Sequence, residues 1–273
     1  MGSGDPYNRT DKLEETLLEA LVARLEARGK HHYFQKMMHE YFDMMEIDTK
    51  DDVLDMGCGT GVAARAVAAR PGFSGKVLGI DKSPFLVQAA ERISKEEGDN
   101  GRVTFQVGDS GDLNLEDNRF DAVIAHTLVS HVDDPSAVIK EAARLVRPGG
   151  MVGIFDGDYA SMTFGQKDPI KNKHDDERLI KSVVTNPYVM RQMPRLLKEA
   201  GLESVACFPY VLAEIGKADF WLPGIESFKK IMPAAGEMSD QEAAAWAEGL
   251  MASSKEGTFF GASNYYGYVA RKP

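Results

Sequence analysis

The chain has 273 residues, of which 42 are acidic and 32 are basic, giving a formal net charge of −10. This acidic balance argues against a nucleic-acid partner, because phosphate recognition needs a basic face. The length allows one large α/β domain with an elaboration, or two small domains. No apolar run approaches the roughly 20 residues of a membrane-spanning helix, so no membrane span is expected.

Cysteine content and the N-terminus indicate the compartment. Only Cys58 and Cys207 are present, which excludes a disulfide framework and fits a reducing environment. The N-terminus is polar and lacks the apolar stretch of a signal peptide. A cytoplasmic location is therefore expected. The first four residues, Met-Gly-Ser-Gly, fit either a remnant of cloning or native sequence.

Residues 1–48 are expected to form a helical cover beside a main domain over 49–273. Asp11 with Glu14 resembles a capping box, and leucines recur every fourth residue from Leu13 to Leu25. A second helix over 33–45 carries a broad stripe of aromatic residues and methionines. Packing at the domain edge is the favoured interpretation, and a lid over a ligand site is the alternative. Tyr33, close upstream of a glycine-rich segment, is a candidate ligand contact.

The glycine-rich segment is Val53-Leu54-Asp55-Met56-Gly57-Cys58-Gly59-Thr60-Gly61. Apolar residues ending in an acid predict a buried strand, and the residues over 62–70 predict a helix directly after the turn. Glycines let a backbone approach a ligand closely, and a helix start offers free N–H groups. A small polar ligand is therefore expected at this turn.

Strands and helices alternate through the first two thirds of the chain. Strands are expected over 76–81, 102–107, 120–126 and 151–156, with helices over 84–97 and 135–146 and a break at 98–101. Such alternation predicts βαβ units and a mainly parallel sheet, in which ligands bind beyond the carboxyl ends of the strands. The polar residues at or near these ends are Asp55, Asp81, Asp109, His126 and Asp156.

The last third is expected to finish the sheet and to elaborate it. Residues 157–194 are less regular, and Pro194 is expected to begin a helix that ends at Gly201. Further strands are expected over 205–211 and 258–270. Between them lie a helix over 220–231, which Pro223-Gly224 interrupts, and a second helix after a capping box of Ser239 and Glu242. Elaborations are thus expected at about 157–200 and 212–256.

Two classes of ligand fit a glycine turn. A dinucleotide-binding turn reads Gly-x-Gly-x-x-Gly, but Val62 stands at its third glycine and Gly61 comes one residue early. A nicotinamide-dependent dehydrogenase therefore remains only as the alternative. The observed spacing, Asp55-x-Gly57-x-Gly59-x-Gly61, resembles motif I of the class I S-adenosylmethionine-dependent methyltransferases.

The resemblance continues in order over about residues 50–156. Asp81 looks like that family's ribose-binding acid, and Gly108-Asp109-Ser110 is similar to its adenine-contacting segment. The segments 120–123 and 145–150 match its fourth strand and the turn before its fifth. The resemblance is to the type 11, quinone- and secondary-metabolite-type members. It implies a Rossmann-like seven-stranded mainly parallel sheet flanked by helices, with N-terminal helices and a late helical insertion.

The implied cofactor is S-adenosyl-L-methionine, and the implied product is S-adenosyl-L-homocysteine. Asp81 suits the ribose diol, Asp109 the adenine amino group and Asp55 the ammonium, although each also fits a turn or helix cap. Cys58 is interpreted as a small loop residue, and no metal site is expected. The candidate cofactor contacts are Tyr33, Asp55, Gly57, Cys58, Gly59, Asp81, Lys82, Gly108, Asp109, Ser110 and His126.

Methyl transfer requires alignment of an acceptor, and a base only where the acceptor loses a proton. His126, His131 and Tyr159 are the candidate catalytic residues, with Asp156 and Asp158 nearby in sequence. Lining the cofactor's methionine part is the favoured interpretation of His126, and capping the loop before Asp133 that of His131.

Aromatic residues in the later elaborations favour a flat or apolar small-molecule acceptor. Whether O, N or C is methylated stays open, as does the oligomeric state. Aminopropyl transfer, a cyclisation, or a non-catalytic cofactor-binding protein are the other possibilities.

Overall fold

The computed structural model describes residues 5–48, 51–98 and 101–273. The first four residues, with the question of their origin, lie outside the described residues. So do residue 49, where the main domain was expected to begin, and residues 99–100 of the expected break. The proposed division at 48/49 stays a prediction.

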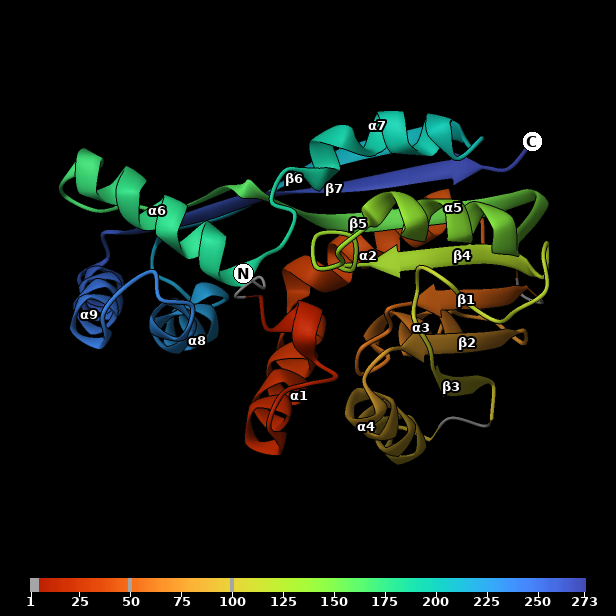
Figure 1. Ribbon diagram of the computed structural model, residues 1–273, viewed down its shortest axis with the longest axis horizontal. Helices are drawn as coiled ribbons and strands as arrows, with labels where there is room; N and C mark the ends of the chain where they lie inside the picture. Colours follow the sequence, from red (N-terminus) through yellow and green to blue (C-terminus); the bar gives the residue numbers. More distant parts are fainter. Residues whose placement is uncertain (1–4, 49–50, 99–100) are drawn as a thin grey trace.

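Seven strands form one sheet in the order β3-β2-β1-β4-β5-β7-β6 (Figure 1). The first five are parallel, and β7 runs antiparallel to both β5 and β6. This arrangement confirms the expected mainly parallel α/β fold. The strands are β1 Asp52–Met56, β2 Lys76–Asp81, β3 Val103–Val107, β4 Phe120–His126, β5 Val146–Phe164, β6 Glu203–Gly216 and β7 Phe259–Arg271.

Helices cover both faces of the sheet. α2 (His32–Met44), α3 (Val62–Ala68) and α4 (Pro84–Glu96) pack on one face, and α5 (Pro135–Leu145) and α7 (Val189–Glu199) on the other (Figure 1). Successive strand residues point to opposite faces. Val53 accordingly joins the cluster that contains Phe34 and Phe42, whereas Leu54 joins the one that contains Ile139.

The last three strands continue past the rest of the sheet into a region here called the helical extension. β5, β6 and β7 are 19, 14 and 13 residues long, and α6 (Pro169–Val183), α8 (Trp221–Ala234) and α9 (Asp240–Glu256) pack around their far ends (Figure 1). The Phe164 ring lies at the centre of this extension, 5.1 Å from the Trp221 ring and 5.6 Å from the Trp246 ring.

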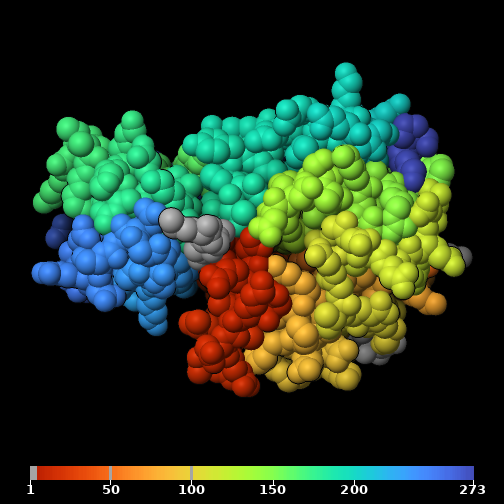
Figure 2. Space-filling view, in the orientation of Figure 1, coloured from red at the N-terminus to blue at the C-terminus, as the bar shows by residue number. Residues whose placement is uncertain are grey.

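The N-terminal elements lie between the body and the extension. Figure 2 shows the red N-terminal helices between the blue extension and the yellow and orange body. A short 3₁₀ turn, η1 (Tyr7–Arg9), precedes α1 (Glu15–Lys30). The Arg24 guanidinium of α1 lies 5.1 Å from the Phe228 ring of α8. In the described part of the chain, no helix has the length and apolar character needed to cross a bilayer.

The structure corrects two helix starts. α1 begins at Glu15 without a side-chain cap, and Leu17 is 53% exposed while Leu18 is buried, so the packed stripe is offset from the expected one. α7 begins at Val189, and Pro194 lies inside it. A proline leaves the carbonyl four residues earlier without a donor. Here the Tyr268 hydroxyl donates to that carbonyl of Met190 at 3.0 Å, so the helix continues.

Two further helices differ from expectation in the later half. α6 lies in the stretch that was expected to be irregular, and Asp168 caps it by accepting from the Ile170 N–H at 2.9 Å. α8 is not interrupted by Pro223, which lies in its first turn, where a missing N–H removes no helical bond. The capping box of Ser239 and Glu242 is confirmed.

Candidate functional site

The glycine turn joins β1 to α3 and has backbone angles that favour glycine. Gly57, Gly59 and Gly61 have φ values of +64°, +54° and +79°. A Cβ added at Gly57 would lie 2.3 Å from Leu128 Cδ1. The Cys58 N–H donates to the Ile80 carbonyl of β2 at 2.9 Å. A side chain at Gly57 is thus disfavoured both by the backbone angle and by lack of space.

Asp81 lies at the end of β2 and holds the turn against the next helix. Its Oδ2 accepts from the Gly59 N–H and its Oδ1 from the Ser83 N–H, both at 2.9 Å. Burial raises the pKa of this carboxyl, while the two backbone donors oppose that shift. Each carboxylate oxygen retains a second lone pair, which can accept from a ligand hydroxyl.

Asp55, at the end of β1, is 1% exposed and only half satisfied. Its Oδ2 accepts from the Ala64 N–H at 3.0 Å, but its Oδ1 meets no donor among the residues that the structure describes. Burial raises the pKa of this carboxyl to about 7. A buried oxygen without a partner is costly, so a donor supplied by a ligand would stabilise it.

Arg28 of α1 brings a positive charge to the same cavity. Its Nη2 donates to the Thr127 Oγ1 at 2.9 Å, and its guanidinium lies 5.2 Å from the Phe34 ring. Within the described ranges no carboxylate forms an ion pair with it. The sequence analysis missed this residue. Its signal is that Arg28 continues the helical stripe of Leu21 and Leu25 at the next core-facing position.

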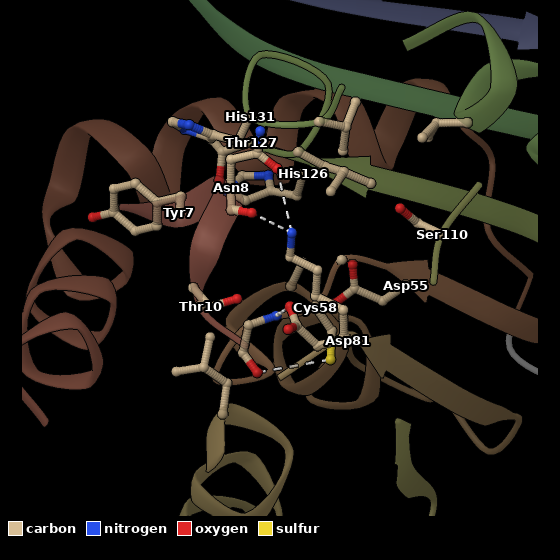
Figure 3. Close-up of a pocket in the computed structure, with 18 of the residues that line it drawn as sticks. Tyr7, Asn8, Thr10, Asp55, Cys58, Asp81, Ser110, His126, Thr127 and His131 are labelled. Atoms are coloured by element: carbon tan, nitrogen blue, oxygen red, sulfur yellow. Dashed lines mark hydrogen bonds between the residues drawn. The ribbon is translucent and has the colours of Figure 1, made fainter. Parts of the chain in front are cut away.

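These groups surround one cavity of about 410 Å³ (Figure 3). It brings together most of the predicted site residues, namely Asp55, Gly57, Cys58, Gly59, Asp81, Lys82, Gly108, Asp109, Ser110, His126 and His131. Tyr33 is not among the residues that line the cavity, and its ring lies 4.1 Å from the His32 ring. Phe34 lines the cavity instead. Tyr159 contacts the Nε2 of His131 through its hydroxyl and is not among the lining residues either.

Three features of the cavity match the chemical groups of S-adenosylmethionine. The unpaired Oδ1 of Asp55 can accept from the ammonium of the cofactor, and the Arg28 guanidinium can pair with its carboxylate. The free lone pairs of Asp81 suit the ribose diol. Asp109 accepts from the Gly111 N–H at 2.9 Å through Oδ1, so its turn-capping role and a ligand contact through Oδ2 are compatible.

His126, which is half-buried, and Cys58, which is buried, are both uncharged. The His126 Nδ1 lies 3.0 Å from the Tyr41 hydroxyl, and its ring stacks on Phe155 at 5.0 Å. Burial and, to a smaller extent, the charge of Arg28 lower the pKa of His126 to about 3, which makes it a poor proton acceptor. Burial also raises the pKa of the Cys58 thiol well above its usual range, which keeps it protonated.

His131 lies on the opposite wall from Asp81 and has two polar partners. Its Nδ1 lies 2.8 Å from Asp5 Oδ2, and its Nε2 lies 3.3 Å from the Tyr159 hydroxyl. The cap of α5 is provided by Asp134, which accepts from the Ala137 N–H at 3.1 Å.

The two remaining acids near the strand ends are both engaged. Asp156 accepts from the Ser130 N–H and hydroxyl at 3.0 and 2.9 Å. Asp158 forms a two-pronged ion pair with Arg191 at 2.9–3.0 Å. Neither carboxylate lines the cavity in the described structure.

Residues 5–11, here called the N-terminal strap, close one side of the cavity. The Asn8 Nδ2 donates to Asp133 Oδ1 at 2.7 Å, and the Lys82 ammonium donates to the Asn8 carbonyl. The Ser83 hydroxyl donates to the Thr10 carbonyl at 3.3 Å. In Figure 3, Tyr7 and Asn8 of the strap lie on the other side of the cavity from Asp55 and Ser110. The sequence did not predict that the strap belongs to the site, because only Asp11 at its end belongs to a recognised pattern.

Comparison with known proteins yields both sequence and structural relatives. A family model described as a methyltransferase domain matches residues 47–201. An uncharacterized 37.1 kDa protein in a Streptomyces fradiae transposon is 29% identical over 84% of this chain and 65% of its own length. The Aspergillus fumigatus sterol 24-C-methyltransferase erg6 is 31% identical over 48% of this chain, and the matched part is 34% of that enzyme. The chain thus spans between a third and two thirds of these relatives.

A solved structure shares the fold along the whole chain. Phosphoethanolamine N-methyltransferase 2 of Haemonchus contortus, in complex with phosphomonomethylethanolamine and S-adenosylhomocysteine, aligns with a TM-score of 0.60 at 19% identity. The alignment covers 100% of this chain and 61% of that enzyme.

Proposed function

Because this chain belongs to the methyltransferase-domain family, we propose that the protein transfers a methyl group from S-adenosylmethionine to a small-molecule acceptor. The domain belongs to the class I, S-adenosylmethionine-dependent methyltransferases. Methyl transfer converts this cofactor to S-adenosylhomocysteine. Relatives named for the methylation of sterols and of arsenite support an acceptor of small size.

The observation that carries this proposal is the distribution of charge in the cavity. An unpaired carboxylate oxygen on Asp55 and the Arg28 guanidinium match the two opposite charges of an amino-acid end. Asp81 supplies acceptors at the next strand end. A nicotinamide dinucleotide would instead bring a pyrophosphate, which is ill matched to a cavity with three acidic strand ends.

The acceptor is proposed to be flat and partly apolar, such as a phenol, a hydroquinone or a similar secondary metabolite. Phe34, Leu128 and the ring of Tyr7 line the cavity beside His131. The Phe34 ring also stacks on Phe220 at 5.6 Å with an interplanar angle of 13°, which continues the aromatic surface toward the extension. Such surfaces favour aromatic ligands.

Mass spectrometry with trideuteromethyl-labelled cofactor tests this proposal. The purified protein is incubated with labelled S-adenosylmethionine and a panel of phenols, hydroquinones and amines. We expect one acceptor class to gain a single labelled methyl group, with S-adenosylhomocysteine formed in equal amount. The Asp81→Ala variant, which weakens cofactor binding, is the control for background methylation.

Two other product patterns would contradict the proposal. Formation of methylthioadenosine together with an acceptor that gains a 3-amino-3-carboxypropyl group would indicate transfer of the cofactor's amino-acid chain, the counterpart of aminopropyl transfer for a cofactor that keeps its carboxylate. A rearranged acceptor of unchanged mass, with the cofactor intact, would indicate a cyclisation.

A further inference from the structure

Asp5, His131 and Tyr159 form a buried hydrogen-bonded chain at the acceptor side of the cavity. We propose that Asp5 is a positioning residue, which holds His131 as the proton acceptor for a hydroxyl-bearing methyl acceptor and does so only when the N-terminal strap lies over the cavity. This inference rests on the proposed methyltransferase function and adds a base and the element that assembles it.

The contacts of Asp5 fix its own state and the state of His131. Asp5 is fully buried, and its Oδ2 accepts from the Thr185 N–H and the Thr185 hydroxyl, both at 3.0 Å. Its Oδ1 accepts from the Tyr7 N–H at 2.9 Å. A carboxyl that receives several donors is stabilised as the carboxylate. A carboxylate only accepts, so the Nδ1 of His131, 2.8 Å away, must donate.

With Nδ1 as the donor, the Nε2 of a neutral His131 carries the lone pair. This nitrogen faces the Tyr159 hydroxyl at 3.3 Å. Burial raises the pKa of Tyr159 well above its usual range, so it stays a hydroxyl and donates to Nε2. The other charged or titratable groups around His131 are Tyr7, whose ring lies 4.8 Å away, Asp156 and, beyond Tyr159, Arg28.

A bulge in β5 aims Tyr159 at this position. β5 pairs Asp158 with Asn264 and Thr163 with Ala262, so residues 159–162 stand opposite Ser263 alone. The Asn264 N–H donates to the Ser161 hydroxyl at 2.8 Å within the bulge. Bulges re-aim side chains at sheet rims, and this one turns Tyr159 toward the loop after β4.

The other candidate bases are less suited to accept a proton. His126 has a pKa lowered to about 3. Asp156 is engaged by Ser130, and Asp158 by Arg191. Among the candidates that the structure describes, His131 alone both lines the cavity and has an accepting nitrogen toward a single weak partner.

The step balances for a hydroxyl acceptor. The acceptor oxygen forms a bond to the methyl carbon, and the carbon–sulfur bond breaks with its electron pair retained on sulfur, giving S-adenosylhomocysteine. The acceptor hydroxyl takes the place of the Tyr159 hydroxyl at His131 Nε2, and its proton moves to that nitrogen. The resulting imidazolium is paired with the Asp5 carboxylate. This is the arrangement in which a buried acid orients a histidine base and stabilises its charged form.

The strap links this base to the cofactor side. Lys82, directly after the ribose-side Asp81, donates to the carbonyl of Asn8, three residues beyond Asp5. The cavity of about 410 Å³ is near the lower end for ligand sites, which range over roughly 300–1,000 Å³, and the strap forms one of its walls, so we expect the strap to move as the acceptor enters. Asp5 leaves His131 when the strap opens, so the base is complete only in the closed site.

The tautomer of His131 tests the inference without any turnover. Imidazole ¹⁵N shifts are measured by NMR at about pH 8, where free histidine is neutral, with S-adenosylhomocysteine bound and with His131→Gln to assign the signal. We expect a protonated Nδ1 and an unprotonated Nε2, and a shift toward the other tautomer in Asp5→Asn. A protonated Nε2 in the unaltered protein would overturn the inference.

Kinetics on an acceptor found by mass spectrometry test the role in turnover. Asp5→Asn should lower kcat about 10²-fold, the lower range for loss of a general base, with KM for the cofactor changed less than about threefold. The double variant with His131→Gln should be no slower than His131→Gln alone, because Asp5 acts through His131. Glu15→Gln, which removes an exposed carboxylate at the start of α1 just beyond the strap, is the matched control and should stay within about twofold.

The outcomes separate the two proposals. If Asp5→Asn weakens cofactor binding as much as it lowers turnover, or if its effect adds to that of His131→Gln, Asp5 serves only the structure of the strap. If no acceptor is methylated by the unaltered protein, the proposed function fails while the tautomer measurement still decides whether Asp5 sets the state of His131.

Discussion

Asp55 and Arg28 show how single residues equip this cavity. Each is held by one polar contact, through the Ala64 N–H and the Thr127 hydroxyl, and each keeps capacity for a charged ligand group. Thr127 has a φ of +54°, an unusual angle for a β-branched residue, which the surrounding structure imposes next to the cavity. The glycine-turn motif was enough to predict Asp55 as a site residue. The role of Arg28 could be seen only once the packing of α1 against the cavity was known.

The pKa of Asp55 gives a prediction for cofactor binding. With a pKa of about 7, this carboxyl is mostly protonated in the free protein at about pH 6, and a bound ammonium favours its ionised form. Binding of S-adenosylhomocysteine at that pH should therefore release close to one proton, and affinity should rise between about pH 5 and 7. Calorimetry in buffers of different ionisation enthalpy measures the release.

Asp55→Asn serves as the control for this proton release. The amide keeps the shape of the side chain but cannot ionise, so the variant should bind more weakly and release fewer protons. Equal release from the variant and from the unaltered protein would assign the proton to another group.

At the scale of elements, the caps and the strand ends were predictable because they depend on neighbours in sequence. Ser83 with Pro84, and Ser239 with Glu242, begin α4 and α9 as expected. The bulge at 159–162, α6 and the start of α7 were not predicted. Their causes are distant contacts, such as the Tyr268 hydroxyl on the Met190 carbonyl, which no local pattern reveals.

The helical extension depends on the aromatic cluster around Phe164. This residue is fully buried between Trp221 and Trp246, so Phe164→Ala leaves a cavity and should lower the free energy of unfolding by about 3–5 kcal/mol. Denaturant unfolding followed by tryptophan fluorescence measures the loss directly, because these are the two tryptophans of the chain.

Phe260→Ala is the matched control in the same region. Phe260 is 40% exposed, and its truncation should cost less than about 1 kcal/mol. A similar loss for both variants would show that the Phe164 cluster does not hold the extension together.

At the scale of the whole molecule, the sheet and the cofactor side of the site could be predicted because strands and helices alternate regularly along this part of the chain. Asp55, Asp81 and Asp109 follow successive strands, so topology alone brings them to one edge. The acceptor side is assembled from the strap, α1, the loop after β4 and the β5 bulge. These pieces are far apart in sequence and share no motif, which is why Asp5, Tyr7 and Arg28 emerged only from the structure.

Calorimetric titration with S-adenosylhomocysteine, beside NAD and the Asp81→Ala variant, tests the central claim most directly. We expect one binding site for S-adenosylhomocysteine, no response to NAD, and a loss of about 1.5–3 kcal/mol of binding free energy in Asp81→Ala, the value of hydrogen bonds to a charged group. Thermal unfolding of the variant checks that it is folded. Binding of NAD without a response to S-adenosylhomocysteine, or an affinity unchanged by Asp81→Ala in a folded variant, would contradict it.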